Sequence, residues 1–124
     1  MENDQITSKI IGAAIEVHKE LGPGLLESAY EKCLLYEIRN QGLKVESQIL
    51  LPVKFKDVEI DAGYRMDLLV EDKIVVEINA VDYMADIYLA QILTYMKLGG
   101  YHLGLLINFN VTKLVDGVKR VING

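Results

Sequence analysis

The stretch YRMDLLVEDKIVVEINAVD, residues 64–82, places two carboxylates, Asp67 and Glu77, inside apolar runs. These runs are rich in β-branched residues and lie on either side of the charged segment 71–73. This pattern predicts two consecutive strands joined by a tight turn. Whether the two carboxylates can act together depends on the length of that turn.

Two registers are open. A two-residue loop, 71–72, pairs Asp67 with Val76 and turns Glu77 to the other face of the sheet. A three-residue loop, 71–73, pairs Asp67 directly with Glu77. Both side chains then start from one face, with their Cβ atoms about 5 Å apart. Asn79 shares the face of Glu77, because side chains on a strand repeat every second residue.

The opposite face is apolar, since it carries Leu68, Val70, Val76 and Ile78. A carboxylate in such surroundings costs several kcal/mol to bury without a partner. Two adjacent carboxylates also repel each other unless a cation lies between them. The alternative is surface charge on a half-solvated sheet, or an ion pair with Arg65 or Lys73.

Periodicity and stop signals predict the other elements. In chain order, they are a helix from Thr7 or Ser8 to Leu21, a helix from Leu25 to Asn40, strands over 45–55, 58–70 and 73–81, a helix over 85–100, a strand over 102–109 and a short helix over 111–122. Pro52 indicates an edge strand or a bulge. The expected fold is α/β: residues 1–124 form one domain, with a central mixed β-sheet flanked by helices in three layers.

Composition excludes several classes of protein. The chain is 51% hydrophobic with a net charge of −5, so no general electrostatic attraction to nucleic acid is expected. Cys33 is the single cysteine, and the two histidines have no partners at zinc-ligand spacing. The N-terminal run matches neither a signal peptide nor a membrane span, so a reduced, cytoplasmic setting is expected.

Two polar pairs lie on predicted helices. Glu27 and Tyr30 are three residues apart near a helix start, and Gln91 and Tyr95 are four apart on a later helix. Each pair can share a helix face. The alternatives are stabilisation of the helix dipole by Glu27 and half-buried packing of the second pair against the sheet.

Together these residues resemble a known family. IIGAAIEVHKELGPGLLESAYEKCL, YRMDLLVEDKIVVEINA, AQILTYMKLGG and LGLLINFNV are similar to segments of the GxxExxY proteins, a branch of the PD-(D/E)XK nuclease superfamily. The naming motif is intact as Gly24, Glu27 and Tyr30. The resemblance covers almost the whole chain, and its α-β-β-β-α-β core agrees with the predicted order.

The resemblance implies a metal-dependent nuclease site for DNA or RNA. It implies that Asp67 and Glu77 bind Mg²⁺ or Mn²⁺, that Glu27 completes or supports the site, and that the Ile78 carbonyl is a further ligand. It also implies that Gln91 and Tyr95 orient the site or contact the phosphate backbone.

Asn79 departs from the family pattern, which has lysine at this position. An asparagine can hydrogen-bond a water but brings no positive charge. Two hypotheses follow: an active or impaired phosphodiesterase, and an inactive module that keeps the fold and binds nucleic acid or protein. At this chain length we expect a homodimer or a partner protein to supply specificity, and no membrane.

Overall fold

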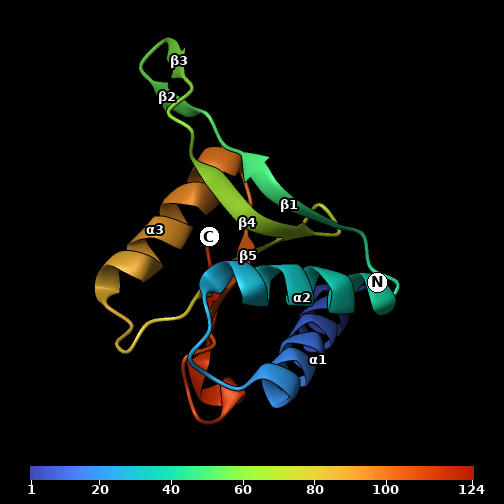
Figure 1. The fold of residues 1–124 in the computed structure, drawn as a ribbon. Coiled ribbons are helices and arrows are strands. Elements are labelled where there is room, and N and C mark those ends of the chain that lie inside the picture. The colour runs from blue at the N-terminus through green and yellow to red at the C-terminus, as the bar shows by residue number, and fades with distance from the viewer.

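The computed structural model describes all residues, 1–124. Its elements are α1 (Asn3–Leu21), α2 (Glu27–Asn40), β1 (Val45–Leu50), β2 (Val53–Phe55), β3 (Val58–Ile60), β4 (Arg65–Val70), β5 (Ile74–Asn79), α3 (Asp86–Gly99), β6 (Leu103–Asn108), the 3₁₀ turn η1 (Leu114–Gly117) and β7 (Val118–Ile122). Figure 1 shows their arrangement. No helix combines the length and the apolar character needed to cross a membrane.

A five-stranded sheet forms the centre of the molecule, with the order β1-β4-β5-β6-β7. The β5–β6 pair is parallel, and the other three pairs are antiparallel. Every residue of β5 and β6 is buried, as expected for central strands covered on both faces. The predicted α/β class with a mixed sheet is confirmed.

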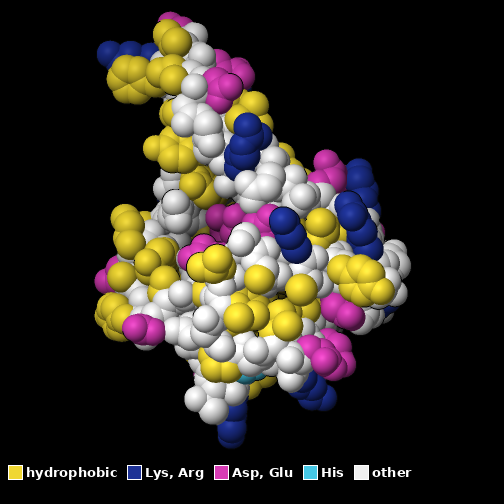
Figure 2. Space-filling view, viewed as in Figure 1, with side chains coloured by type: hydrophobic (Ala, Val, Ile, Leu, Met, Phe, Trp, Pro, Cys, Tyr) yellow, Lys and Arg dark blue, Asp and Glu magenta, His cyan; other side chains and the backbone are white.

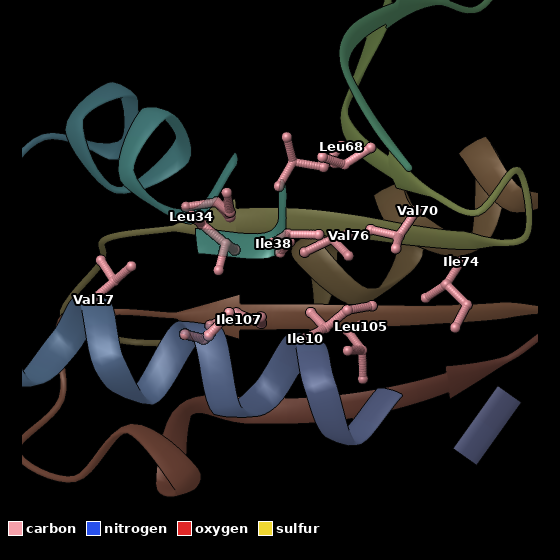
Figure 3. Close-up of a cluster of buried hydrophobic side chains, with 14 of the residues drawn as sticks. Ile10, Val17, Leu34, Ile38, Leu68, Val70, Ile74, Val76, Leu105 and Ile107 are labelled. Carbon is pink, nitrogen blue, oxygen red and sulfur yellow. The ribbon is translucent and has the colours of Figure 1, made fainter. Parts of the chain in front are cut away.

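Helices cover both faces of this sheet, giving three layers. The first core lies between the sheet and the α1–α2 pair, and Figure 3 shows Ile10, Val17, Leu34, Ile38, Leu68, Val70, Ile74, Val76, Leu105 and Ile107 within it. The second core lies under α3 and includes Leu69, Val75, Ile92, Tyr95, Met96 and Leu106. Alternate residues of β5, and of β4 from Leu68 to Val70, therefore feed different cores. Asp67 and Glu77 have the strand parity of Leu69 and Val75, which lie on the α3 side.

The first and the last of the expected helices differ from the structure. The first helix begins at Asn3, because Glu2 and Gln5 form a capping box and Thr7 lies inside the helix with its hydroxyl bonded to the Asn3 carbonyl. The segment 111–122 forms η1 and then β7, which pairs antiparallel with β6. The predicted last helix was wrong because pairing with β6 overrides the local helical spacing.

The predicted strands over 45–55 and 58–70 each break in two. β1 ends at Leu50, and β2 and β3 then form a separate two-stranded sheet. This hairpin, which we call the arm (residues 52–63), projects from the body in Figure 1. Pro52 lies at the base of the arm, directly after β1, which is an edge strand as predicted.

Candidate functional site

The turn between β4 and β5 sets the register of the two carboxylates. The Lys73 N–H donates to the Val70 carbonyl at 3.0 Å, and Glu71 and Asp72 have φ of 53° and 56°. These angles fit a two-residue turn of the type I′ class. Lys73 is then an extra residue, because Val70 pairs with Ile74 and not with Lys73. The register is therefore that of the three-residue alternative, which places Asp67 opposite Glu77.

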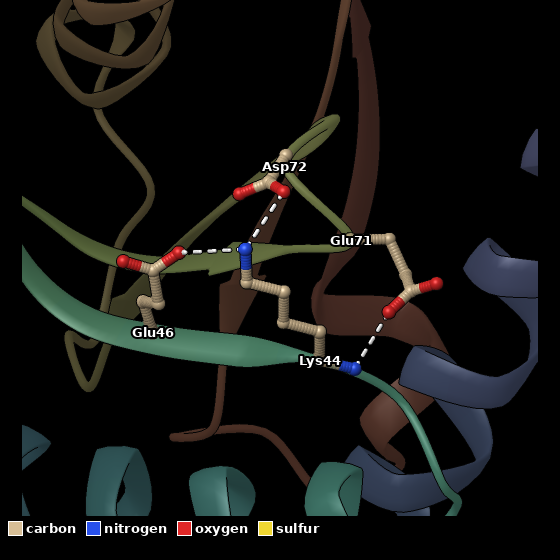
Figure 4. A network of polar contacts seen from close by, with 4 residues as sticks. All are labelled: Lys44, Glu46, Glu71 and Asp72. Carbon is tan, nitrogen blue, oxygen red and sulfur yellow. Dashed lines mark hydrogen bonds and ion pairs between the residues drawn. The ribbon is translucent and has the colours of Figure 1, made fainter.

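Polar contacts with the start of β1 hold this turn, as Figure 4 shows. The Lys44 N–H donates to Glu71 Oε2 at 2.6 Å, and the Glu71 N–H donates to the Lys44 carbonyl at 2.8 Å. Lys44 Nζ lies 2.9 Å from Asp72 Oδ2 and 3.7 Å from Glu46 Oε1. These ion pairs are exposed, so they fix the local geometry more than they add stability.

The Asp67 and Glu77 carboxylates each accept a hydrogen bond from the main chain of the facing strand. The Asp67 N–H donates to Glu77 Oε2 at 2.7 Å, and the Ile78 N–H donates to Asp67 Oδ2 at 2.8 Å. Regular β4–β5 pairing ends one step earlier, at Leu68 and Val76. The carboxylates thus occupy the place where the ladder opens. One oxygen of each is held by a backbone donor, and the second oxygen has no main-chain donor.

Both carboxyl groups are hard to ionise. Burial, together with the negative charge of Asp67, raises the pKa of Glu77 to about 8, and the hydrogen bond from the Asp67 N–H opposes this rise. Burial likewise raises the pKa of Asp67 to about 6, with a contribution from the neighbouring Glu31. Neither group forms an ion pair with a lysine or arginine. Such a pair of acids without a cation is typical of functional sites.

The loop before α2 explains the Gly24–Glu27–Tyr30 motif. Gly24 has φ of 99°, which side chains disfavour. The Tyr30 hydroxyl donates to the Gly22 carbonyl at 2.6 Å and accepts from the Leu25 N–H at 3.1 Å. The ring is fully buried and stacks on Phe109, with centroids 4.5 Å apart. Tyr30 therefore anchors the loop from the core side, while Glu27 begins α2 with an exposed side chain.

Glu31 joins this acidic group and was missed from the sequence. Its carboxylate accepts two hydrogen bonds from Gln48 Nε2, at 2.8 and 3.0 Å. Its charge raises the pKa of both Asp67 and Glu77, ahead of the contribution of Glu27. The signal was available, since Glu31 is one helical turn after Glu27 and so shares its face. Figure 2 shows acidic side chains gathered where α2, β4 and α3 meet.

The Gln91–Tyr95 pair approaches from the other side. Gln91 Nε2 donates to the Tyr95 hydroxyl at 3.0 Å, so the predicted pairing on one helix face is confirmed. Tyr95 is 7% exposed. Burial raises its pKa, and the charges of Glu77 and Asp67 raise it further. The Tyr95 hydroxyl on α3 therefore interacts electrostatically with the Glu77 and Asp67 carboxylates.

Asn79 ends β5 on the Glu77 side and is 8% exposed. Its carbonyl accepts from the Phe109 N–H at 2.9 Å. No fully buried side-chain nitrogen or oxygen lacks a hydrogen-bond partner, and no hydrogen bond involves the Asn79 amide. Solvent therefore reaches that amide. The lysines of 52–63 lie on the arm, outside the five-stranded sheet, so neither takes the place of the missing lysine.

The donors present fit a hard divalent cation by their chemistry. They are carboxylate, carbonyl and amide oxygens, which Mg²⁺ and Mn²⁺ prefer, and a cation would relieve the repulsion that raises the two pKa values. No group of three or more His, Cys, Asp or Glu side chains is arranged as a metal site in this structure. Glu27 does not close a three-carboxylate set with Asp67 and Glu77 here, and its role as a further ligand stays a prediction.

Comparison with known proteins gives one match. A family model described as "PD-(D/E)XK nuclease superfamily" matches residues 4–121. No curated protein and no solved structure matches the chain.

Proposed function

Because the chain belongs to the PD-(D/E)XK nuclease superfamily, we propose that it is a metal-dependent phosphodiesterase that acts on DNA or RNA. The observation that supports this most strongly is the Asp67–Glu77 pair, whose carboxylates accept hydrogen bonds from the N–H groups of Ile78 and Asp67, respectively, and lack a cationic partner. We further propose that the protein is a single domain of the GxxExxY branch. The intact Gly24–Glu27–Tyr30 motif supports this, since each of its residues has a distinct structural place.

Asp67, Glu77 and the Ile78 carbonyl would hold Mg²⁺ or Mn²⁺, with Glu27 and Glu31 adding negative charge around them. The bound cation would supply Lewis-acid polarisation of the phosphate and a nucleophilic water at neutral pH. The second oxygens of Asp67 and Glu77 are the groups left available for it.

The remaining residues would position the substrate. The Gln91 amide and the Tyr95 hydroxyl, joined by their hydrogen bond, would donate to a phosphate oxygen and fix its orientation. The Asn79 amide, which solvent reaches, would hold the attacking water by a hydrogen bond. It adds no charge against the negative charge that develops on the phosphate, so the expected turnover is slow.

A second function is supported by Asn79 itself. Without a lysine at this position, the fold could serve as a module that binds nucleic acid or protein without cleavage. The acidic cluster favours the enzyme, because a pure binding surface for phosphates gains nothing from four neighbouring carboxyl groups.

The test is cleavage of labelled single-stranded and double-stranded DNA and RNA in Mn²⁺, in Mg²⁺ and in EDTA. We expect slow, metal-dependent release of fragments by the native chain and none by Asp67→Asn. The Asn side chain keeps the size of Asp67 and can still accept the Ile78 N–H, so loss of activity would report the lost charge. The matched control is Asp57→Asn on the exposed arm, which should cleave as the native chain does. Equal cleavage by Asp67→Asn would contradict the proposed site.

A further inference from the structure

An apolar groove lies directly beside the candidate site, between α3 and the base of the arm. It has a volume of about 600 Å³ and is lined mainly by Val53, Tyr64, Ile87, Tyr88, Tyr95 and Leu98. Gln91 also lines it, so both members of the hydrogen-bonded Gln91–Tyr95 pair face the groove. A ligand in the groove would therefore contact the Gln91–Tyr95 pair of the candidate site.

The arm extends one wall of this groove with an apolar face. The register pairs Val53 with Ile60, Lys54 with Glu59 and Phe55 with Val58. Paired residues of an antiparallel ladder point to the same face, so the four apolar residues share one face and the two charged residues share the other. Phe55 and Val58 are 60% and 57% exposed. Figure 2 shows hydrophobic side chains running from the arm down over α3.

Aromatic rings are set into the floor of the groove. Tyr64 is 47% exposed, and its ring centroid lies 6.2 Å from that of Tyr95, with the planes at 50°. Tyr88 lines the same surface. Exposed aromatic faces of this kind stack with nucleic-acid bases, independently of sequence.

We propose that this groove binds unpaired bases, so that the substrate of the adjacent site is single-stranded nucleic acid or a single-stranded end. The proposal rests on the proposed function for the reaction, and on the groove alone for the binding. Two observations favour this occupant: the polar pair Gln91–Tyr95 lines the groove, and the groove offers tyrosine faces beside that pair. A paired duplex buries its base faces and could not use the rings.

The charge of the molecule limits how the groove can hold nucleic acid. The chain carries a net charge of −5, so it cannot rely on phosphate contacts for affinity. On the arm, Lys54 lies on the face opposite the apolar one, and Lys56 Nζ lies 5.5 Å from the Phe55 ring centroid. Base stacking must therefore supply most of the binding.

The test is binding to three fluorescein-labelled probes: a thymidine oligonucleotide, an abasic strand with the same number of phosphates, and a blunt duplex. Anisotropy is measured in EDTA, where no cleavage occurs, so the result does not depend on catalysis. We expect the thymidine strand to bind at least about tenfold more tightly than the other two, and Tyr64→Ala to remove about that factor. Tyr64→Phe, which keeps the ring, should bind as the native chain does.

Two further variants guard the interpretation. Tyr36→Ala removes a tyrosine that is 64% exposed on α2, outside the groove, and should leave binding unchanged. Ile87→Glu places a negative charge at a groove position that is 67% exposed, where folding should tolerate it, and should weaken binding. Strands containing 5-iodouracil should photocrosslink to Tyr64 or Tyr88.

Equal affinity for the abasic strand, or an unchanged affinity in both Tyr64→Ala and Ile87→Glu, would overturn the proposal. Sedimentation decides the competing occupant: a native dimer that Tyr64→Ala or Ile87→Glu dissociates would assign the groove to a second copy of the chain. If the thymidine strand binds as expected but no metal-dependent cleavage occurs, the groove assignment is supported and the proposed phosphodiesterase function is wrong.

Discussion

Asn79 brings no charge to the candidate site. It lies on the Glu77 side of β5 with an amide that solvent reaches. A lysine at the same place would keep the backbone and add an ammonium group beside the two carboxylates. Lys44 does not supply the missing charge, because it pairs with Asp72 and Glu46 at the turn end of the β4–β5 hairpin, away from Asn79.

We therefore predict that Asn79→Lys cleaves nucleic acid faster than the native chain by about 10²-fold or more, the scale of one transition-state stabiliser. The gain should require Mg²⁺ or Mn²⁺, because the carboxylates must still hold the cation. Initial rates of fragment release measure it. The double variant Asn79→Lys, Asp67→Asn is the control and should be inactive. If the single variant cleaves no faster than the native chain, the missing charge is not what limits the rate.

Glu77 ties stability to pH. The folded state raises the pKa of Glu77 from its ordinary value of 4.5 to about 8, and that of Asp67 from 3.8 to about 6. An acid whose pKa is raised on folding stays protonated to a higher pH in the folded state than in the unfolded state. Its favourable contribution to the free energy of unfolding is therefore complete below about pH 4. That contribution is lost as the pH rises toward about 8, and it changes little above that.

Glu77→Gln removes this loss, because the amide is neutral and its oxygen can still accept the Asp67 N–H. We expect the variant to melt about 5 °C or more above the native chain at pH 8.5 without metal, with the difference vanishing near pH 4. Mn²⁺ at pH 8.5 should raise the melting temperature of the native chain and not that of Glu77→Gln. Glu59→Gln on the arm makes the same chemical change at an exposed site and should follow the native chain throughout. A pH-independent difference would mean that Glu77 is not the titrating group.

At the scale of elements, α3 brings Gln91 and Tyr95 to the site because it packs closely on β6. A Cβ added at Gly104 would lie 2.9 Å from Met96 Sδ and 3.3 Å from the Val75 carbonyl oxygen. The glycine therefore lets α3 lie close to the sheet. We predict that Gly104→Ala lowers the free energy of unfolding by about 1–3 kcal/mol and lowers the cleavage rate as well, because α3 must shift outward.

Gly12→Ala is the matched control. It makes the same chemical change in the middle of α1, where an added Cβ meets no atom within 4 Å. There the substitution should stabilise the protein by about 0.5–1 kcal/mol and leave activity unchanged. Denaturant unfolding and initial rates measure both variants. If Gly104→Ala keeps full activity, the position of α3 does not control the site.

The sequence predicted the elements that depend on local patterns, and it failed where the structure depends on contacts distant in sequence. Helix spacing and the apolar runs located α2, α3, β5 and β6, because each element buries a face that its own sequence displays. The β4–β5 register stayed open until the structure placed Lys73 as an extra residue, since turn conformation depends on Lys44, far away in sequence. β7 looked helical locally and is a strand because β6 offers it an edge.

The candidate site was also predicted only in part. The Gln91–Tyr95 pair and the adjacency of Asp67 and Glu77 follow from periodicity once the register is known. The hydrogen bonds from the Asp67 N–H to Glu77 and from the Ile78 N–H to Asp67 do not follow from periodicity. They require β4 and β5 to separate beyond the Leu68–Val76 pair. The arm was also not predicted, because a continuous strand over 45–55 would have placed Lys54 in the main sheet.

At the scale of the molecule, the arm is separable from the body. No residue of 52–63 belongs to either core, and an isolated two-stranded hairpin is only marginally stable. The chain is continuous across its base, where the Leu51 N–H donates to the Tyr64 carbonyl at 2.8 Å. A tight Asn-Gly turn can therefore replace residues 53–62 without moving β1 or β4.

We predict that this armless protein unfolds cooperatively, with a melting temperature within about 5 °C of the native chain, since neither core loses a side chain. Its affinity for the thymidine strand should fall by about tenfold or more, because one wall of the groove is gone, while the maximal cleavage rate at saturating strand stays within about twofold. Calorimetry, anisotropy and the separation of kcat from KM check the three parts. A control with Lys54 and Lys56 both changed to Ala keeps the apolar wall and removes only charge, so its affinity should fall much less. If that control loses as much affinity as the armless protein, the arm acts through charge and not through its apolar face.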